Sequence, residues 1–159
     1  YDSPRTVYDE PASVYAAQFI GSPAINLVEG TIDLVDGVPG VRTQALFLVL
    51  DRDRASGMAD NPGRNVLVGI RPQHISLAQH YAARRSSDSS VEVVVEFVEN
   101  LGDRSLVIGR CASGTALRFL TTRDTDIAVD GRLEVFIDGR RLHLFDPETG
   151  GNLLAHGGT

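Results

Sequence analysis

Three polar residues with binding chemistry, Arg71, Gln73 and His74, lie together in the stretch Val66–Leu77, which reads VLVGIRPQHISL. A guanidinium, a carboxamide and an imidazole can all donate hydrogen bonds, so the group is a candidate site for a small anion, with the hydroxyl of Ser76 beside it. The same residues have a structural alternative, in which Arg71 and His74 hold the turn by donating to neighbouring backbone carbonyls. The sequence leaves both interpretations open.

Recognisable catalytic and metal-binding motifs are missing from the sequence: it has no G-x-x-x-x-G-K-[ST], G-x-G-x-x-G, C-x-x-C or H-E-x-x-H. A triad built on His143 and Asp146 is not supported, because His143 alternates with the apolar Leu142 and Leu144 and Asp146 begins an Asp-Pro turn. The single Cys111 ends an apolar run and is expected to be a small buried residue. We therefore expect no catalytic residue, metal ligand or cofactor-binding residue in this chain.

Charge and hydropathy exclude two further classes of protein. The formal net charge is −6 over 159 residues, whereas a nucleic-acid-binding protein needs a basic face. No apolar run approaches the length of about 18 residues that a membrane-spanning helix requires. Arg84 and Arg85, beside three serines, are a candidate phosphate-binding patch, but the composition of His80–Ser90 is more typical of a mobile surface loop.

The candidate site is positioned by an expected strand and a tight turn. Alternate residues from Val66 to Ile70 share one face of the strand, and Arg71 belongs to the other face. Pro72 ends the strand, because its ring fixes φ and removes a hydrogen-bond donor. The residue before a proline is held extended, so Arg71 is expected to continue the strand conformation.

A short helix is expected over Ala12–Ile20, with Tyr15 and Phe19 one turn apart. Asp9-Glu10-Pro11 is a helix-start signal, and Gly21-Ser22-Pro23 ends the helix. Its apolar face needs a cover, because a bare apolar helix is marginal in water. Either the β domain supplies that cover, or a missing N-terminal part of the protein does. For the chain on its own, we expect the helix to pack on a second copy or to be exchanged between two copies.

Strands are expected at Leu27–Leu34 and Thr43–Leu50, joined by a turn at Asp36–Gly40. The polar, turn-rich segment Asp51–Asn65 is expected to be a solvated loop or a short surface helix.

The second half of the chain predicts a series of short antiparallel strands. They are Val91–Glu99, Ser105–Cys111, Thr115–Thr121, Arg132–Ile137 and Arg140–Phe145. Phe97 is expected to point inward with Val91, Val93 and Val95. Asp138-Gly139 is expected to form a two-residue type I′ hairpin turn. Short strands at regular turns favour a mainly β fold, either a barrel or a sandwich.

Four segments match a known family in the right order. Tyr8–Gly30, YDEPASVYAAQFIGSPAINLVEG, closely resembles the segment that leaves the nucleotide-binding domain in MalK-type ATPases of bacterial carbohydrate ABC importers. Val68–His74 resembles the VGIRPEH motif of that family, and Val95–Arg110 resembles its VExLG strand–turn–strand. Leu142–Leu153, LHLFDPETGGNL, is similar to its terminal LHLFDPETG. Gln73 stands where the family usually has Glu, which weakens a charge-based role for this turn.

The resemblance implies a mainly β fold, an OB-like/TOBE β-barrel with a short N-terminal helical segment. Residues 1–25 would be the last helix and linker of a nucleotide-binding domain, and residues 26–159 the regulatory OB-like/TOBE domain. The family's ATP and Mg site would lie upstream of Tyr1, so this chain is expected to be a piece of a longer protein and not to be an enzyme itself.

The implied function is regulation and dimerisation of the ATPase subunit of an importer for sugars, polyols or glycerophosphate-type compounds. The implied partners are a second copy of the chain, the permease subunits and a regulatory protein, at the cytoplasmic side of the bacterial plasma membrane. No nucleic acid is expected. As an alternative, related TOBE-type domains bind oxyanions, and Arg71, His74 and Ser76 would line such a site.

Overall fold

The computed structural model describes residues 11–19, 21, 23–55, 57–58, 61–81 and 84–154, and the strands of this part form two antiparallel sheets. The helices are α2 (Val14–Phe19) and α3 (Arg52–Ala55), and single 3-10 turns occur at η1 (Pro72–His74), η2 (Ala78–His80) and η3 (Gly139–Arg141). The strands are β1 (Asn26–Val35), β2 (Val38–Thr43), β3 (Phe47–Val49), β4 (Asn65–Ile70), β5 (Ile75–Leu77), β6 (Asp88–Asn100), β7 (Arg104–Arg110), β8 (Ala116–Thr122), β9 (Arg132–Asp138) and β10 (His143–Phe145). The mainly β fold is confirmed.

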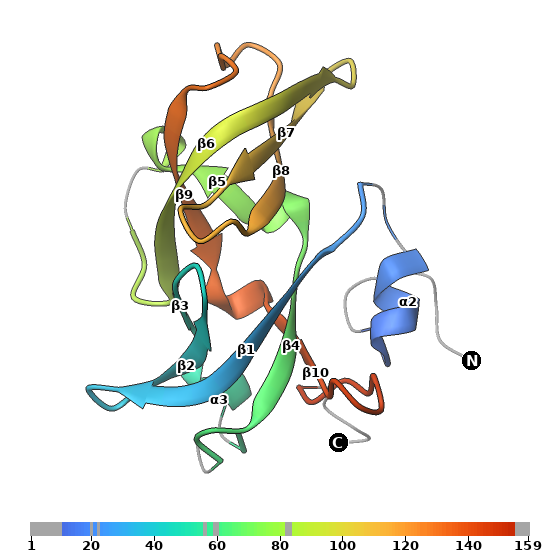
Figure 1. The fold of residues 1–159 in the computed structure, drawn as a ribbon, viewed down its shortest axis with the longest axis vertical. Coiled ribbons are helices and arrows are strands. Elements are labelled where there is room, and N and C mark those ends of the chain that lie inside the picture. Colours follow the sequence, from blue (N-terminus) through green and yellow to red (C-terminus); the bar gives the residue numbers. More distant parts are fainter. Residues whose placement is uncertain are drawn as a thin grey trace.

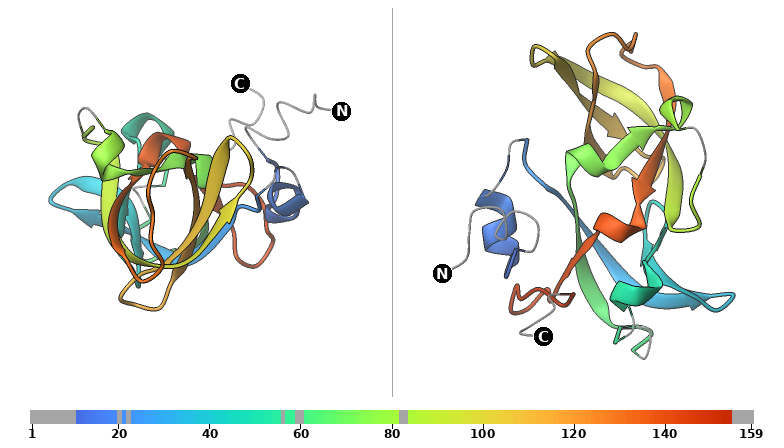
Figure 2. Two further views of the ribbon diagram at one scale, coloured as in Figure 1. Left: turned by 90° about the horizontal axis from the view of Figure 1, so that it is seen from above. Right: turned by 180° about the vertical axis from the view of Figure 1, so that it is seen from behind.

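The chain passes between the two sheets twice. The first sheet has the order β10-β4-β1-β2-β3 and the second the order β5-β9-β6-β7-β8. The turn η1 carries the chain from β4 to β5, and η3 carries it back from β9 to β10 (Figure 1). Seen from above, the strands of the second sheet curl round into a barrel-like ring (Figure 2).

One apolar core joins the sheets. Val68 and Ile32 of the first sheet belong to the same buried cluster as Val93, Val107 and Phe119 of the second. The expected alternation of β4 is confirmed, because Val66, Val68 and Ile70 are all buried in this cluster. The other face of the strand is also covered, since Leu67 packs against a second cluster built on Ala17, Ile25 and Phe145.

Helix α2 packs on its own chain. Ala17 is fully buried and Val14 packs beside it, against the outer face of the first sheet. Of the two alternatives, the β domain therefore supplies the cover for this side of the helix, and the expected packing on a second copy is wrong for this side. The Tyr15 and Phe19 rings, 4.6 Å apart, point the other way and are 68% and 70% exposed. Ile20, the last residue of the expected helix, lies outside the described residues.

The expected strand Thr43–Leu50 is confirmed only over β3 (Phe47–Val49), because the chain turns between Thr43 and Leu46. The Thr43 hydroxyl accepts hydrogen bonds from the backbone N–H groups of Ala45 and Leu46 and donates to the Leu46 carbonyl. These bonds stabilise a tight turn between β2 and β3. The expected five-residue turn before it is shorter too: Asp36 and Gly37 both have positive φ and form a two-residue hairpin loop.

Asp138-Gly139 is not a hairpin turn, because β9 and β10 belong to different sheets. Gly139 instead begins η3, and the Asp138 carboxylate accepts a hydrogen bond from the backbone N–H of Arg140. A Cβ atom at Gly139 would collide with the carbonyl oxygens of Val49 and Ser87. Glycine is required here for close approach of the backbone, and not for a left-handed turn.

The expectation that Phe97 points inward is wrong. A β-bulge between Val95 and Phe97 adds one residue to β6 relative to β7, so the alternation of side chains reverses there. Val95 is fully buried and Phe97 is 48% exposed, whereas Val98 packs against the core in its place.

The segment Asp51–Asn65 is less solvated than its composition predicts. The short helix α3 does form, as one of the two expected alternatives. Ala55 and Met58, however, are buried members of the core.

Candidate functional site

The turn after β4 sends its polar side chains in different directions. Arg71 has extended backbone angles, as expected before a proline, and its side chain is only 1% exposed. Its Nη1 donates a hydrogen bond of 3.2 Å to the backbone carbonyl of Ala17 in α2. Gln73 is exposed and half-buried His74 ends η1, where its backbone N–H donates to the Arg71 carbonyl. Arg71 therefore holds the helix through its guanidinium, whereas the Gln73 side chain is exposed.

A second set of contacts holds the same helix from the C-terminal side. The backbone N–H of Val14 donates to the Gly150 carbonyl, and that of Asn152 donates to the Ala12 carbonyl, both at 2.9 Å. The Asn152 side chain donates to the Pro11 carbonyl. The N-terminal segment is thus bound both to the first sheet and to the turn that follows β10. No local sequence signal marks Asn152 for this contact.

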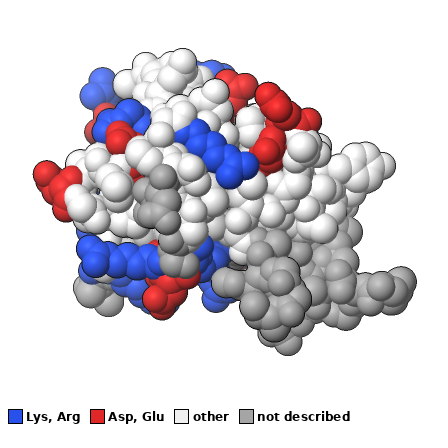
Figure 3. Space-filling view, turned by 90° about the horizontal axis from the view of Figure 1, so that it is seen from below, with Lys and Arg blue, Asp and Glu red and all other residues white. Residues whose placement is uncertain are grey.

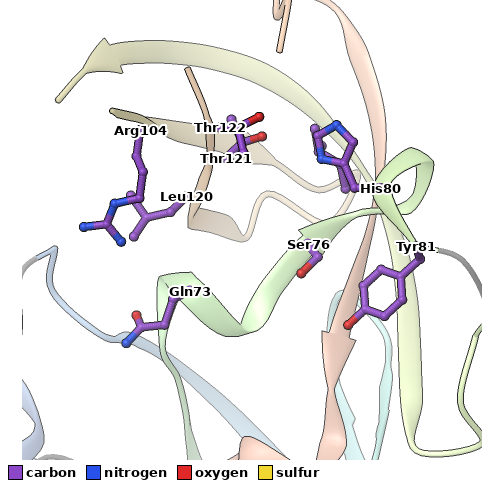
Figure 4. Close-up of a pocket in the computed structure, with 9 residues that line it drawn as sticks. Gln73, Ser76, His80, Tyr81, Arg104, Leu120, Thr121 and Thr122 are labelled. Carbon is purple, nitrogen blue, oxygen red and sulfur yellow. The ribbon is translucent and has the colours of Figure 1, made fainter. Parts of the chain in front are cut away.

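A cavity of about 430 Å³ lies where η1, β5 and η2 face the end of β8 and the start of β7. Leu77 and Leu120 form its apolar lining. The polar lining comprises Gln73, Ser76, His80, Tyr81, Arg104, Thr121 and Thr122 (Figure 4). Sequence reasoning singled out Gln73 and Ser76, but missed the β7 and β8 residues, because only the curled sheet brings them close.

Arg84 and Arg85, the less favoured candidate for a phosphate patch, make local contacts. The Arg84 guanidinium lies 5.6 Å from the centre of the Phe136 ring and donates to the backbone carbonyl of Asp88. The backbone N–H of Arg85 donates to the Asp88 carboxylate. Acidic and basic residues are interspersed on the face seen in Figure 3.

The carboxylates of Asp146 and Asp138 both accept hydrogen bonds that stabilise turns. Asp146 accepts hydrogen bonds from the backbone N–H groups of Glu148 and Thr149, which lower its pKa, and Arg64 pairs with it. Burial tends to raise the pKa of Asp138, but hydrogen bonds from the Arg140 side chain and backbone outweigh burial and hold it below its usual value. Cys111 is buried as expected, and burial raises the pKa of its thiol.

Neither a metal centre nor a membrane-spanning helix is found in the described part of the chain. The residues described contain no group of three or more His, Cys, Asp or Glu side chains arranged to hold a metal ion. None of the described helices is long and apolar enough to cross a membrane.

Family models match the chain over two adjoining regions. The MalK OB fold domain matches residues 21–75, and the TOBE domain matches residues 68–145. The two regions overlap at the passage from β4 through η1 to β5, which contains Arg71, Gln73 and His74. The chain belongs to the MalK OB/TOBE family. The expected resemblance is therefore confirmed.

Curated relatives of this family are ATP-binding proteins of import systems. The trehalose/maltose import ATP-binding protein MalK of Thermococcus litoralis is 32% identical over 93% of this chain and 39% of its own length. The diacetylchitobiose uptake system ATP-binding protein MsiK of Streptomyces coelicolor is 33% identical over 96% and 42%. The sn-glycerol-3-phosphate import ATP-binding protein UgpC of Bordetella pertussis is 35% identical over 93% and 38%. The chain thus spans about two-fifths of the length of these relatives.

A solved structure shares the fold. The cytoplasmic molybdate-binding protein ModG, with molybdate bound, aligns with a TM-score of 0.62 and 16% sequence identity, covering 77% of this chain and 96% of that one. At this identity the likeness shows that the arrangement of strands is shared.

Proposed function

We propose that this chain is the regulatory and dimerisation part of the ATP-binding subunit of an ABC importer for sugars, polyols or glycerophosphate-type compounds. The observation that carries the proposal is the pair of adjoining family matches, which together cover residues 21–145. The relatives named for sugar and glycerol-phosphate import support the substrate class. In this proposal the chain performs no chemistry, and it keeps two subunits associated while other parts of the subunit move.

The arrangement of α2 supports a connection to the rest of the subunit. The helix is fixed to the first sheet by Ala17 and Arg71, yet it leaves Tyr15 and Phe19 exposed. We infer that residues 1–25 are the last helix and linker of the nucleotide-binding domain, and that these two rings face that domain. A rigid joint of this kind would transmit its movement to the OB/TOBE part, residues 26–159.

The proposal assigns the remaining partners to the parent protein. ATP and Mg would be bound by the nucleotide-binding domain, and the permease subunits would hold the assembly at the cytoplasmic side of the bacterial plasma membrane. A regulatory protein is a further partner, whereas nucleic acid is not, given the net charge of −6.

The test uses the complete ATP-binding subunit beside a version that ends before Asn26. We expect the truncated subunit to bind ATP and to dissociate into monomers without nucleotide, whereas the complete subunit stays dimeric. A truncated subunit that remains fully dimeric without nucleotide would contradict the proposal.

A second candidate is oxyanion binding, which the shared fold with molybdate-binding ModG favours. The notional site of Arg71, His74 and Ser76 is weakened by the hydrogen bond from Arg71 to Ala17, which directs the guanidinium toward the helix. Titration with molybdate tests it: saturable binding that is lost in His74→Ala and Ser76→Ala would support this site. Absence of binding would leave the regulatory function as the better account.

A further inference from the structure

The cavity of about 430 Å³ beside η1 has the size of a small-molecule site. Its lining comes from chain segments far apart in sequence: Gln73 and Ser76 on one side, Arg104 and Thr122 on the other, and His80 closing one end (Figure 4). Such convergence of polar groups around an apolar lining is what distinguishes a binding site from a surface irregularity.

The chemistry of the lining selects the kind of ligand. Among the described residues that line the cavity there is no Asp or Glu, although the chain as a whole carries a net charge of −6. Arg104 supplies a guanidinium to the lining. It pairs with the Asp103 carboxylate at 4.0 Å, and both side chains of this pair are more than half exposed. Such a pair is weak, so this guanidinium is available to a ligand anion.

Polar groups with hydrogen-bonding capacity to spare surround the guanidinium. In the described part of the chain, the side chains of Gln73, Ser76 and His80 form no hydrogen bond to another protein group. The hydroxyls of Thr121 and Thr122 both form hydrogen bonds with the hydroxyl of Thr125. Each oxygen keeps a further lone pair that can accept a hydrogen bond from a ligand. Carboxamide, imidazole and hydroxyl groups in this arrangement match a ligand that carries several hydroxyls.

We propose that this cavity binds a small polyhydroxylated anion, with its charged group on Arg104 and its hydroxyls on Gln73, Ser76 and Thr122. Guanidinium binds a carboxylate and a phosphate ester with the same bidentate geometry, so a sugar acid and a sugar phosphate share the required chemistry. The site shares Gln73 and Ser76 with the candidate anion site named from the sequence, but its charged group is Arg104 and not Arg71. It does not depend on the dimerisation function.

Binding would also have a mechanical consequence. The ligand would bridge β5 to β8, which lie at opposite edges of the second sheet. A bound ligand therefore holds β5 and β8 together and stabilises the folded state. Slower hydrogen exchange in β8 is the expected sign of this bridge.

The experiment is a calorimetric titration of the 159-residue chain with glucose 6-phosphate and gluconate, and with glucose and inorganic phosphate as partial ligands. We expect at least one of the two polyhydroxylated anions to bind about tenfold more tightly than either partial ligand. The stronger of the two identifies the charged group that the site prefers. Inorganic phosphate binding as tightly as glucose 6-phosphate, or saturable binding of neither anion, would overturn the proposal.

Variants locate the binding to this cavity. Arg104→Gln is expected to weaken the anion about tenfold, and Ser76→Ala to weaken it by a smaller factor. Arg132→Gln is the matched control, because Arg132 is also an exposed strand arginine but lies outside the cavity. Thermal unfolding of each variant establishes that it is folded. Equal weakening by Arg104→Gln and Arg132→Gln would contradict a specific site.

Discussion

The Arg71 guanidinium and the Ala17 carbonyl form a hydrogen bond of 3.2 Å that joins the turn after β4 to helix α2. Both residues are almost completely buried, at 1% and 0% exposed. The sequence left Arg71 open between anion binding and a structural hydrogen bond to a neighbouring backbone carbonyl. The carbonyl that it contacts lies 54 positions away along the chain. This contact fastens α2 to the turn after β4 and leaves Tyr15 and Phe19 exposed.

Arg71→Met is expected to loosen α2. Methionine keeps much of the side-chain volume but leaves the buried Ala17 carbonyl without this donor, which costs about 1–3 kcal/mol. Amide hydrogen exchange in residues 14–19 is expected to become about tenfold faster or more, since about 1.4 kcal/mol corresponds to a factor of ten. The exposed Arg132 provides the control variant Arg132→Met. Unchanged exchange in α2 would show that the contact does not hold the helix.

Gly139→Ala is expected to destabilise the whole fold. The added methyl group would collide with the backbone carbonyls of Val49, in β3, and Ser87, in the turn before β6. Overpacking of this kind typically costs about 1–3 kcal/mol, measured as the free energy of unfolding in urea. Gly57→Ala is the matched control, because nothing lies within 4 Å of its added Cβ. Equal stability of the two variants would refute the close approach at η3.

Asn26→Ala is expected to weaken the attachment of β8. The Asn26 amide nitrogen donates to the Ile70 and Arg118 carbonyls, and its oxygen accepts from the backbone N–H of Arg118. Without these bonds, the Ile70 and Arg118 carbonyls and the Arg118 N–H lose hydrogen-bond partners. We expect this to lower the free energy of unfolding by about 2 kcal/mol or more. Asn100→Ala removes only a bond to Gly102 in an exposed turn, so it should cost much less. Similar losses in both variants would argue against the bridging role.

Stability is expected to fall on acidification, partly through Asp138. Burial tends to raise the pKa of this carboxyl, but hydrogen bonds from Arg140 hold its folded pKa below the ordinary value. The unfolded chain keeps a pKa of about 3.9, so the ionised group stabilises the fold above that pH, and this contribution is lost as pH falls through the folded pKa. The urea concentration at the unfolding midpoint should therefore fall less in Asp138→Asn than in the unmodified chain between about pH 6 and about pH 3.

The control for the acid titration is Asp124→Asn, at an exposed turn residue. It should reproduce the pH dependence of the unmodified chain. A decline that is identical in Asp138→Asn and the unmodified chain would mean that other carboxyls account for all of it.

The local strand pattern was predictable wherever the immediate neighbours decide the conformation. Val66 to Ile70 alternate as expected, because each buried side chain contacts the same core. Asp36-Gly37 and Asp138-Gly139 show where this reasoning fails. The first pair forms a two-residue hairpin loop, whereas the second lies between strands of different sheets. The same dipeptide permits both outcomes, and the tertiary contacts of Gly139 decide between them.

The candidate site was only half predictable for a similar reason. Gln73 and Ser76 follow an evident strand end, so sequence alone could mark them. Arg104 and Thr122 join them only because β7 and β8 curl toward η1. The bulge at Glu96 illustrates the same limit, since one extra residue in β6 turns Phe97 outward without any glycine or proline to announce it.

Sedimentation equilibrium of the 159-residue chain over a range of concentrations tests the proposed dimerisation most directly. We predict a concentration-dependent dimer that survives the double substitution Tyr15→Ser and Phe19→Ser, because those rings are assigned to the nucleotide-binding domain. Loss of the dimer in that double variant would mean that two copies associate through the exposed helix face. A strict monomer at every concentration would contradict a dimer contact built into the OB/TOBE part.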